Sequence, residues 1–257
     1  MKRISWLLGL WTALVMVFFY LPIAILIGFS FNTSRLNILW EGFTLDWYAA
    51  IWRDRVLVDS LNNSLVVAAI TTVLAVALGT GGAWLLYRYR FPGLRLWQTL
   101  IFIPMIVPEV IMGVSLLILY VVINLELGYA TIIISHVTFC FPFVMVAVQA
   151  RLSGLDPALE EAAMDLGATP AVAFRRILVP YLMPAIISGA LMSFTLSLDE
   201  LIVTYFTASA GTRTLPLEIF GRVKKGLDPT LNAISTVFIL STVVLVVATE
   251  ILKRRSR

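Results

Sequence analysis

Charged residues are scarce in this chain of 257 residues, because Asp, Glu, Lys and Arg make up 13% of it and hydrophobic residues make up 60%. Soluble domains carry about 25% charged residues, and a soluble fold of this length could not hide so much apolar surface. The mean hydropathy is +0.95. A soluble enzyme and a disordered regulator are therefore excluded, and the sequence predicts an integral membrane protein.

Residues that commonly carry chemistry are also few. The one cysteine, Cys140, excludes an internal disulfide, and the one histidine, His136, leaves little room for a serine–histidine dyad. A G-x-S-x-G elbow is missing as well, since Ser188 and Ser193 flank Gly189 without forming one. An intramembrane protease is thus disfavoured, and His136 is expected to hydrogen-bond between helices.

Lysine is scarce too, with four in the chain, and none of them follows a glycine. A chain that hydrolyses ATP needs G-x-x-x-x-G-K-[ST] to hold phosphates, so this chain is predicted not to be an enzyme. Nothing in the sequence indicates a cofactor or a metal site. The basic residues behind the net charge of +4 cluster at the ends of apolar runs. That pattern indicates membrane topology and not nucleic-acid binding.

Long apolar runs dominate what is present. A membrane helix needs roughly 20 apolar residues, and continuous rather than alternating runs exclude a barrel. Six transmembrane helices are predicted from the runs at 4–34, 61–87, 96–125, 127–150, 177–198 and 229–249. The first run is too long for a signal sequence and is expected to be retained. Gly79, Gly81, Gly82 and Gly128 are predicted to be positions of close helix packing.

The distribution of Lys and Arg predicts that both termini are cytoplasmic. With this orientation, twelve basic residues lie inside: Lys2, Arg3, Arg88, Arg90, Arg95, Arg151, Arg175, Arg176, Lys253, Arg254, Arg255 and Arg257. Seven lie outside: Arg35, Arg53, Arg55, Arg213, Arg222, Lys224 and Lys225.

The connection at 153–180 has the signals of two short helices. Asp156 before Pro157 predicts a helix start, and Gly167 predicts its end. Thr169-Pro170 predicts a second helix that ends before Pro180. The first helix would carry one apolar stripe made of Leu159, Ala162, Ala163 and Leu166. Such a stripe could lie on the membrane surface or accept another protein, and the small alanines allow close approach.

The same segment resembles a known signature. It contains Glu161-Ala162-Ala163, then Gly167 after three residues, then Ile177-Leu178-Val179-Pro180 after nine more. This spacing is similar to the EAA signature of membrane subunits of bacterial ABC importers, with Val179 standing where leucine is usual. Three further matches resemble the spermidine/putrescine branch: Pro108-Glu109, the stretch from Ser197 to Thr204, and the stretch from Arg213 to Leu217.

The resemblance implies an all-α type I ABC importer permease (MetI-like) fold in the bacterial inner membrane. It divides the chain into a first helix with an extracytoplasmic segment at 1–60, a permease core at 61–250, a coupling loop at 153–180 within the core, and a basic cytoplasmic tail at 251–257. The implied partners are a second homologous permease subunit, two cytoplasmic ATPase subunits, an extracytoplasmic solute-binding protein and the lipid bilayer. The implied ATPase-coupling residues are Glu160, Glu161, Ala162, Ala163, Asp165, Gly167, Ile177 and Pro180.

Three acids fall at membrane depth, where a charge is costly and usually faces an aqueous route. Glu109 lies about 13 residues into the third predicted helix, and Asp199 and Glu200 are neighbours in the fifth. Together with Tyr205 they are candidates for the path of a cationic solute. Neighbours on a helix point about 100° apart, so only one of Asp199 and Glu200 is expected to face that path. The alternative is that the acids cap helices or pair at the outer interface.

The function predicted from these observations is a permease subunit that passes a small cationic solute, such as spermidine or putrescine, through an ATP-driven importer. A related amine, an amino-acid-like solute or an aminophosphonate is the alternative substrate. A stand-alone secondary carrier is the alternative class, but it would need paired buried charges and inverted repeats, and no repeat is visible.

Overall fold

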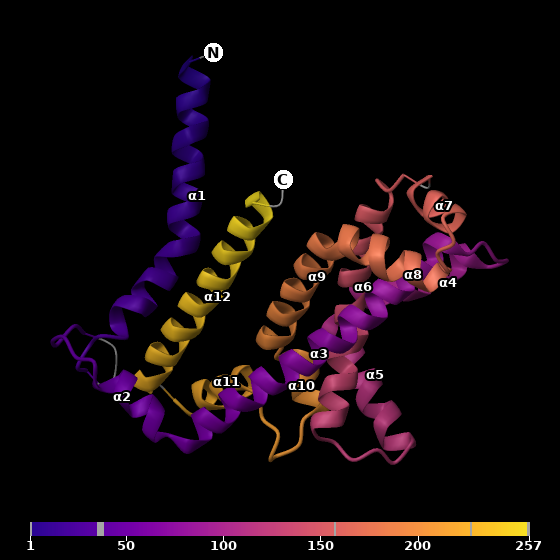
Figure 1. The fold of residues 1–257 in the computed structure, drawn as a ribbon. Helices are drawn as coiled ribbons and strands as arrows, with labels where there is room; N and C mark the ends of the chain where they lie inside the picture. The colour runs from indigo at the N-terminus through magenta and orange to yellow at the C-terminus, as the bar shows by residue number, and fades with distance from the viewer. Residues whose placement is uncertain (1, 35–38, 157, 227, 256–257) are drawn as a thin grey trace. The chain divides into compact units, whose positions relative to one another are not determined.

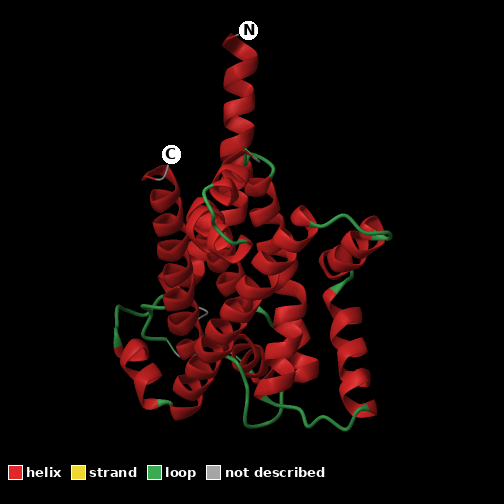
Figure 2. Cartoon of the chain, turned by 45° about the vertical axis from the view of Figure 1, so that its right-hand side comes forward, coloured by secondary structure: helices red, strands yellow, loops and turns green. Residues whose placement is uncertain are grey.

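The computed structural model describes residues 2–34, 39–156, 158–226 and 228–255, and for residues 2–5, 7, 160, 161 and 245–255 it describes the backbone alone. Figure 1 shows the order of the helices, and Figure 2 shows that helices joined by loops account for this part of the chain. Among these residues, β-pairing is limited to one isolated antiparallel bridge between Asn32 and Phe43. The prediction of an all-α protein is confirmed.

The helices fall into two compact units. The first unit, residues 1–59 and 218–246, holds α1 (Lys2–Phe29), α2 (Asp46–Arg53), the end of α11 (Leu215–Lys225) and most of α12 (Pro229–Arg255). The second unit, residues 60–217 and 247–257, holds most of α3 (Arg55–Arg88) and α4 (Leu94–Phe102), η1 (Ile103–Met105), α5 (Glu109–Val122), α6 (Tyr129–Leu152), α7 (Ala158–Asp165), α8 (Pro170–Ala173), η2 (Phe174–Leu178), α9 (Val179–Asp199) and α10 (Ile202–Thr207).

In the first unit, one arginine joins α11 to the start of α3. Arg222 Nη1 lies 2.7 Å from Asp54 Oδ2, and Arg222 Nε lies 2.9 Å from Glu218 Oε1. The other Asp54 oxygen accepts hydrogen bonds from the backbone N–H groups of Val56 and Leu57 at the first turn of α3. The hydrogen bond from Arg222 holds the pKa of the Asp54 carboxyl below its ordinary value. One carboxylate thus serves as both helix cap and ion-pair partner.

Four helical stretches are long and apolar enough to cross a membrane: Leu8–Phe29, Arg55–Arg88, Tyr129–Leu152 and Pro170–Asp199. The third predicted run passes the same test only as a bent pair of helices. In α12, the apolar stretch whose side chains the structure describes is Pro229–Val244. This stretch is shorter than a transmembrane span requires. Four or five candidate spans are therefore present among the described residues.

The continuous helix predicted over 96–125 is wrong. The stretch Leu94–Met105 and α5 meet at an angle of 105°. Pro108 has an extended ψ of 133° and stands directly before α5. A proline lacks the N–H that an uninterrupted helix requires, and it disfavours helical geometry at the residue before it. Glu109 is consequently the first residue of α5 and does not lie in the middle of a helix.

The predicted helix end before Pro180 is also wrong. The chain stays helical from Pro170 to Asp199, through α8, a π-helical turn at η2 and then α9. The wider π turn just before Pro180 relieves the clash between a proline ring and the preceding turn of the helix. The loop at 153–180 therefore ends in the helix that becomes α9.

The core of the second unit forms around one valine. Val144 of α6 is fully buried, and glycines approach it from two sides. A Cβ atom added to Gly79 of α3 would lie 2.7 Å from Val144 Cβ, and one added to Gly189 of α9 would lie 3.0 Å from Val144 Cγ1. The predicted close packing is confirmed at Gly79 and is wrong at Gly81, where an added Cβ would meet nothing within 4 Å. Backbone-close packing of this kind drives helix association in lipid.

We expect Gly79→Ala to destabilise the protein by about 1–3 kcal/mol, because the new methyl group would overlap Val144 and the Phe141 carbonyl oxygen. Gly81→Ala is the matched control in the same helix. It should be neutral or stabilising by up to about 1 kcal/mol, since alanine favours a helix over glycine. Thermal unfolding of the two purified variants in detergent measures the difference. Equal melting temperatures would contradict the packing described here.

Candidate functional site

The connection between α6 and α8 begins as its sequence predicts. Asp156 Oδ1 accepts a hydrogen bond of 3.0 Å from the backbone N–H of Ala158, and α7 starts at that residue. A carboxylate at this position satisfies one of the unpaired N–H groups of the first helical turn and favours its dipole. The predicted helix start is confirmed.

A tight turn at Gly167 ends α7. The Gly167 N–H donates to the Met164 carbonyl at 2.9 Å, and the Ala168 N–H donates to the Ala163 carbonyl at 3.0 Å. This pair of bonds is the Schellman arrangement, which requires a left-handed residue, and Gly167 has a φ of +88°. The predicted glycine stop is confirmed, and a side chain at this position would strain the turn.

The apolar stripe of α7 is turned outward. Leu166 is 90% exposed and Leu159 is 51% exposed, while Ala162 is exposed and Ala163 is half-buried. Asp165 is exposed beside them. The side chains of Glu160 and Glu161 lie outside the residues whose side chains the structure describes. An exposed leucine next to a rigid turn and small alanines gives a surface on which another protein could pack.

The second half of the segment joins the core. The Thr169 hydroxyl accepts from the Val172 N–H, and Pro170 occupies the first position of α8, as its sequence predicts. Ile177 packs against the buried core of the second unit. Pro180 is exposed near the start of α9. Among the predicted coupling residues, Ala162, Asp165 and Gly167 are therefore exposed, whereas Ile177 supports the segment from inside.

Two contacts that the sequence did not predict fasten this segment to neighbouring helices. Arg151 at the end of α6 donates to the Tyr181 carbonyl at 3.3 Å, and the Tyr181 hydroxyl donates to the Arg151 carbonyl at 3.3 Å. The Arg151 guanidinium also lies 4.4 Å from the centre of the Tyr181 ring. The rings of Phe174 in η2 and Trp84 in α3 are 4.9 Å apart. No sequence signal pairs residues 30 or 90 positions apart.

The three acids that the sequence predicts at membrane depth have different surroundings. Glu109 is exposed at the N-terminus of α5, where a negative charge favours the helix dipole. Asp199 is the last residue of α9 and is exposed, and Tyr205 on α10 is 54% exposed. Glu200 is buried, and the carboxylates of Glu109 and Asp199 lie within electrostatic range of it. The structure thus brings the three acids into one neighbourhood.

Glu200 acts as a helix cap. It is not part of α9, because its backbone is extended with a ψ of 119°. Its Oε1 accepts a hydrogen bond of 2.7 Å from the Val203 N–H at the start of α10. The argument that Asp199 and Glu200 are neighbours on one helix is therefore wrong. Asp199 and Glu200 differ in exposure because the chain changes direction between them. Glu200 is buried and Asp199 is exposed.

A buried hydrogen-bond chain fixes this break between α9 and α10. His136 Nδ1 lies 2.8 Å from Ser197 Oγ, and His136 Nε2 lies 2.9 Å from Thr204 Oγ1. The Thr204 hydroxyl donates to the Glu200 carbonyl at 3.1 Å. Thr204 has one proton to give, so Nε2 of His136 donates and Nδ1 accepts, as in a neutral imidazole. The expected role of His136 as a hydrogen-bond partner between helices is confirmed.

The His136–Ser197 pair has the spacing of a nucleophile and its base, but its surroundings do not suit catalysis. His136 is 0% exposed and Ser197 is 3% exposed, so a substrate has no surface to reach. The second imidazole nitrogen is held by Thr204 and not by an orienting carboxylate. No group of three metal-ligating side chains occurs in the part of the chain that the structure describes.

Comparison with known proteins assigns the family. Residues 73–257 match the family described as binding-protein-dependent transport system inner membrane component. The chain belongs to this family. It is therefore a multi-pass permease of the inner membrane and a transport subunit, as the EAA resemblance implied.

Relatives in this permease family match almost end to end. The spermidine/putrescine transport system permease protein PotC of Escherichia coli (strain K12) is 39% identical over 246 residues, which are 96% of this chain and 93% of PotC. The putrescine transport system permease protein PotI of the same strain is 42% identical over 229 residues, which are 86% of this chain and 82% of PotI.

Solved structures of ABC transporters share the fold. A bacterial transporter that imports the acidic polysaccharide alginate has a chain with a TM-score of 0.74 at 14% identity, covering 98% of this chain and 96% of that chain. A chain of the MetNI methionine transporter has a TM-score of 0.65 at 18% identity, covering 81% and 98%. The MetI-like fold that the resemblance implied is confirmed in these permease neighbours.

We expect Glu200→Leu to lower the stability of this permease by about 0.5–2 kcal/mol, because α10 would lose its cap inside the protein. Glu200→Gln keeps an acceptor oxygen and should lose less. Asp199→Leu is the exposed neighbouring control and should leave the melting temperature in detergent within a degree or two. A larger loss from Asp199→Leu than from Glu200→Leu would refute the capping role.

Proposed function

We propose that this chain is the membrane-spanning subunit of an ATP-driven importer that carries a polyamine such as spermidine or putrescine into the cell. The observation that carries the proposal is the 39% identity to PotC along 96% of the chain. The cationic substrate fits the acids at Glu109 and Asp199, which are exposed in one neighbourhood of the second unit. An ammonium group loses hydration in the membrane, and a carboxylate on its path offsets that loss.

The proposed topology has six spans with both termini in the cytoplasm. The bent pair formed by Leu94–Met105 and α5 would be the third span, and α12 would be the sixth. The excess of basic residues at the chain ends and beside α7 supports this orientation. The proposed domains are the first helix and extracytoplasmic segment at 1–60, the permease core at 61–250 with its coupling loop at 153–180, and the tail at 251–257.

The proposed partners supply what this chain lacks. Two cytoplasmic ATPase subunits would hydrolyse ATP, a second homologous permease subunit would complete the pathway, and an extracytoplasmic binding protein would deliver the solute. One solved neighbour is an alginate transporter in complex with a periplasmic protein. On this chain, α7 would dock on an ATPase subunit through Leu166, Ala162 and Ala163, with Glu160, Glu161 and Asp165 at the edge of the contact. Gly167 would set the turn, and Ile177 and Pro180 would anchor it to α9.

The docking role of α7 predicts that Leu166→Asp abolishes transport while leaving the fold intact. Leu166 is 90% exposed, so a charge there costs this chain little but would be buried against the ATPase. We expect at least a tenfold loss of uptake, roughly the loss of one central interface residue. Leu166→Met is the matched control and should keep uptake near native. The measurement is uptake and ATP hydrolysis by the complete complex in proteoliposomes, and native uptake by Leu166→Asp would show that α7 does not dock.

The pathway role predicts that Asp199→Asn cuts spermidine uptake several-fold while ATP hydrolysis stimulated by the binding protein persists. The amide keeps the shape of the side chain but loses most of its attraction for an ammonium group. Glu126→Gln removes an exposed acid from the α5–α6 loop and is the control. If an Asp199→Asn, Glu200→Gln double variant takes up spermidine at the native rate, the cationic route is wrong. The protein would then be an importer of another solute. Competition by an amino acid or an aminophosphonate would name that solute, and uptake by the single chain would indicate a secondary carrier.

A further inference from the structure

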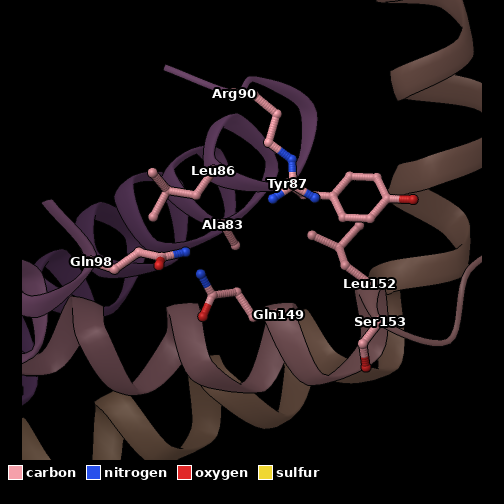
Figure 3. Close-up of a pocket in the computed structure, with 8 residues that line it drawn as sticks. All are labelled: Ala83, Leu86, Tyr87, Arg90, Gln98, Gln149, Leu152 and Ser153. Atoms are coloured by element: carbon pink, nitrogen blue, oxygen red, sulfur yellow. The ribbon is translucent and has the colours of Figure 1, made fainter. Parts of the chain in front are cut away.

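A cavity of about 240 Å³ lies where α3, α4 and α6 meet, at the end of α6 that leads into α7. Its polar lining is formed by Arg90, Gln98, Gln149 and Ser153, and apolar side chains complete the walls (Figure 3). A water molecule takes about 30 Å³ of liquid, and drug-sized ligands occupy pockets of about 300–1,000 Å³. The space therefore suits a group larger than one water and smaller than a drug, such as the polar part of a lipid.

Three nitrogen-bearing side chains converge on this cavity. The amide groups of Gln98 on α4 and Gln149 on α6 are turned toward one another across it, and Arg90 reaches toward it from beyond the end of α3 (Figure 3). Gln98 and Gln149 are half-buried, and Arg90 is exposed at the rim. Within the described chain, none of the three hydrogen-bonds to a protein group or forms an ion pair. Half-buried N–H donors without acceptors favour a ligand that brings acceptors of its own.

The charge of the site selects an anion. Arg90 contributes a permanent positive charge and a planar set of donors that matches phosphate or carboxylate geometry. Either amide can present its NH₂ group to the same oxygen atoms, since a glutamine side chain can turn end for end. The Ser153 hydroxyl already donates to the Ala150 carbonyl at 2.9 Å and so adds no donor. Arg90, Gln98 and Gln149 together make a receptor for a group with several acceptor oxygens.

An exposed apolar surface on α4 lies beside this receptor. None of the residues of α4 is buried, and Leu96, Trp97 and Leu100 are 62%, 56% and 46% exposed. Three apolar side chains close to Gln98 in the sequence are thus exposed and available to acyl chains, although Thr99 beside them is polar. A short helix with apolar side chains on its surface and a tryptophan is typical of the boundary between headgroups and hydrocarbon. Basic pockets between membrane helices at that level bind anionic headgroups.

We propose that this cavity binds the phosphate of an anionic phospholipid, with Arg90 neutralising the charge and Gln98 and Gln149 donating hydrogen bonds to its oxygens. The acyl chains would lie along the exposed apolar side chains of α4. The bound lipid would bridge α3, α4 and α6 at the end of the bundle from which α7 projects. This site is independent of the solute that the protein carries and of the acids near α10.

The test measures lipid retained by the full-length protein. Native and variant chains are reconstituted in phosphatidylcholine vesicles with or without phosphatidylglycerol, extracted in detergent, and examined by native mass spectrometry. We expect the native chain to retain phosphatidylglycerol and Arg90→Gln to retain about tenfold less, which is the order of effect of one charge-assisted hydrogen bond. Arg95→Gln is the matched control, because Arg95 is exposed in the first turn of α4 and does not line the cavity.

A second variant and a second ligand make the result decisive. Gln149→Met keeps the volume of the side chain but removes its donor, so it should also weaken retention, even if Arg90→Gln fails to fold. Inorganic phosphate is then added at millimolar concentration. If it displaces the lipid from the native protein but not from Arg90→Gln, the anion site is confirmed, and free phosphate is identified as a competing ligand. Equal retention of phosphatidylcholine, or an equal loss in Arg95→Gln, would overturn the proposal.

Discussion

The second unit depends on the close approach of three helix backbones at Val144. In lipid there is no hydrophobic force between helices, so contact between backbones must supply the attraction. Gly79 of α3 and Gly189 of α9 leave Val144 of α6 no free space on either side. A single methyl group at either glycine would overlap Val144 and push the two helices apart at this contact. The cavity at Gln149 and the start of the segment at 153–180 both lie at the end of α6, one of the helices that meet here.

The ends of these helices determine where the segment around α7 can lie. Arg151 closes α6 and Tyr181 opens α9, and each donates a hydrogen bond to the other's backbone carbonyl. The π turn at η2 places Phe174 on Trp84 of α3. The segment around α7 is therefore joined to α3, α6 and α9 by packed rings and a continuous helix. The exposed Leu166 thus stands beside a hydrogen-bonded turn that is held to the core on its far side.

At the other end of α9, the polar residues mainly satisfy one another. Backbone groups in a membrane must find partners within the protein, and the break after Asp199 exposes several of them. Glu200 accepts from the Val203 N–H, Thr204 donates to the Glu200 carbonyl, and His136 joins both sides of the break. An ionisable residue at membrane depth can thus be a structural necessity. Glu109 and Asp199, in contrast, keep exposed side chains.

Local patterns determined much of this protein from sequence: the apolar runs, the Asp156 cap, the Gly167 turn and the EAA spacing can each be read from one continuous stretch of the chain. The sequence did not predict the bend before Glu109, the continuation through Pro180, or the different surroundings of Asp199 and Glu200. A proline permits a kink, a break or a π turn, and packing against other helices selects among them. The Val144 contact, the Arg151–Tyr181 pair and the cavity at Gln149 join residues from distant parts of the chain. Such contacts exist only once the helices pack, and no local pattern records them.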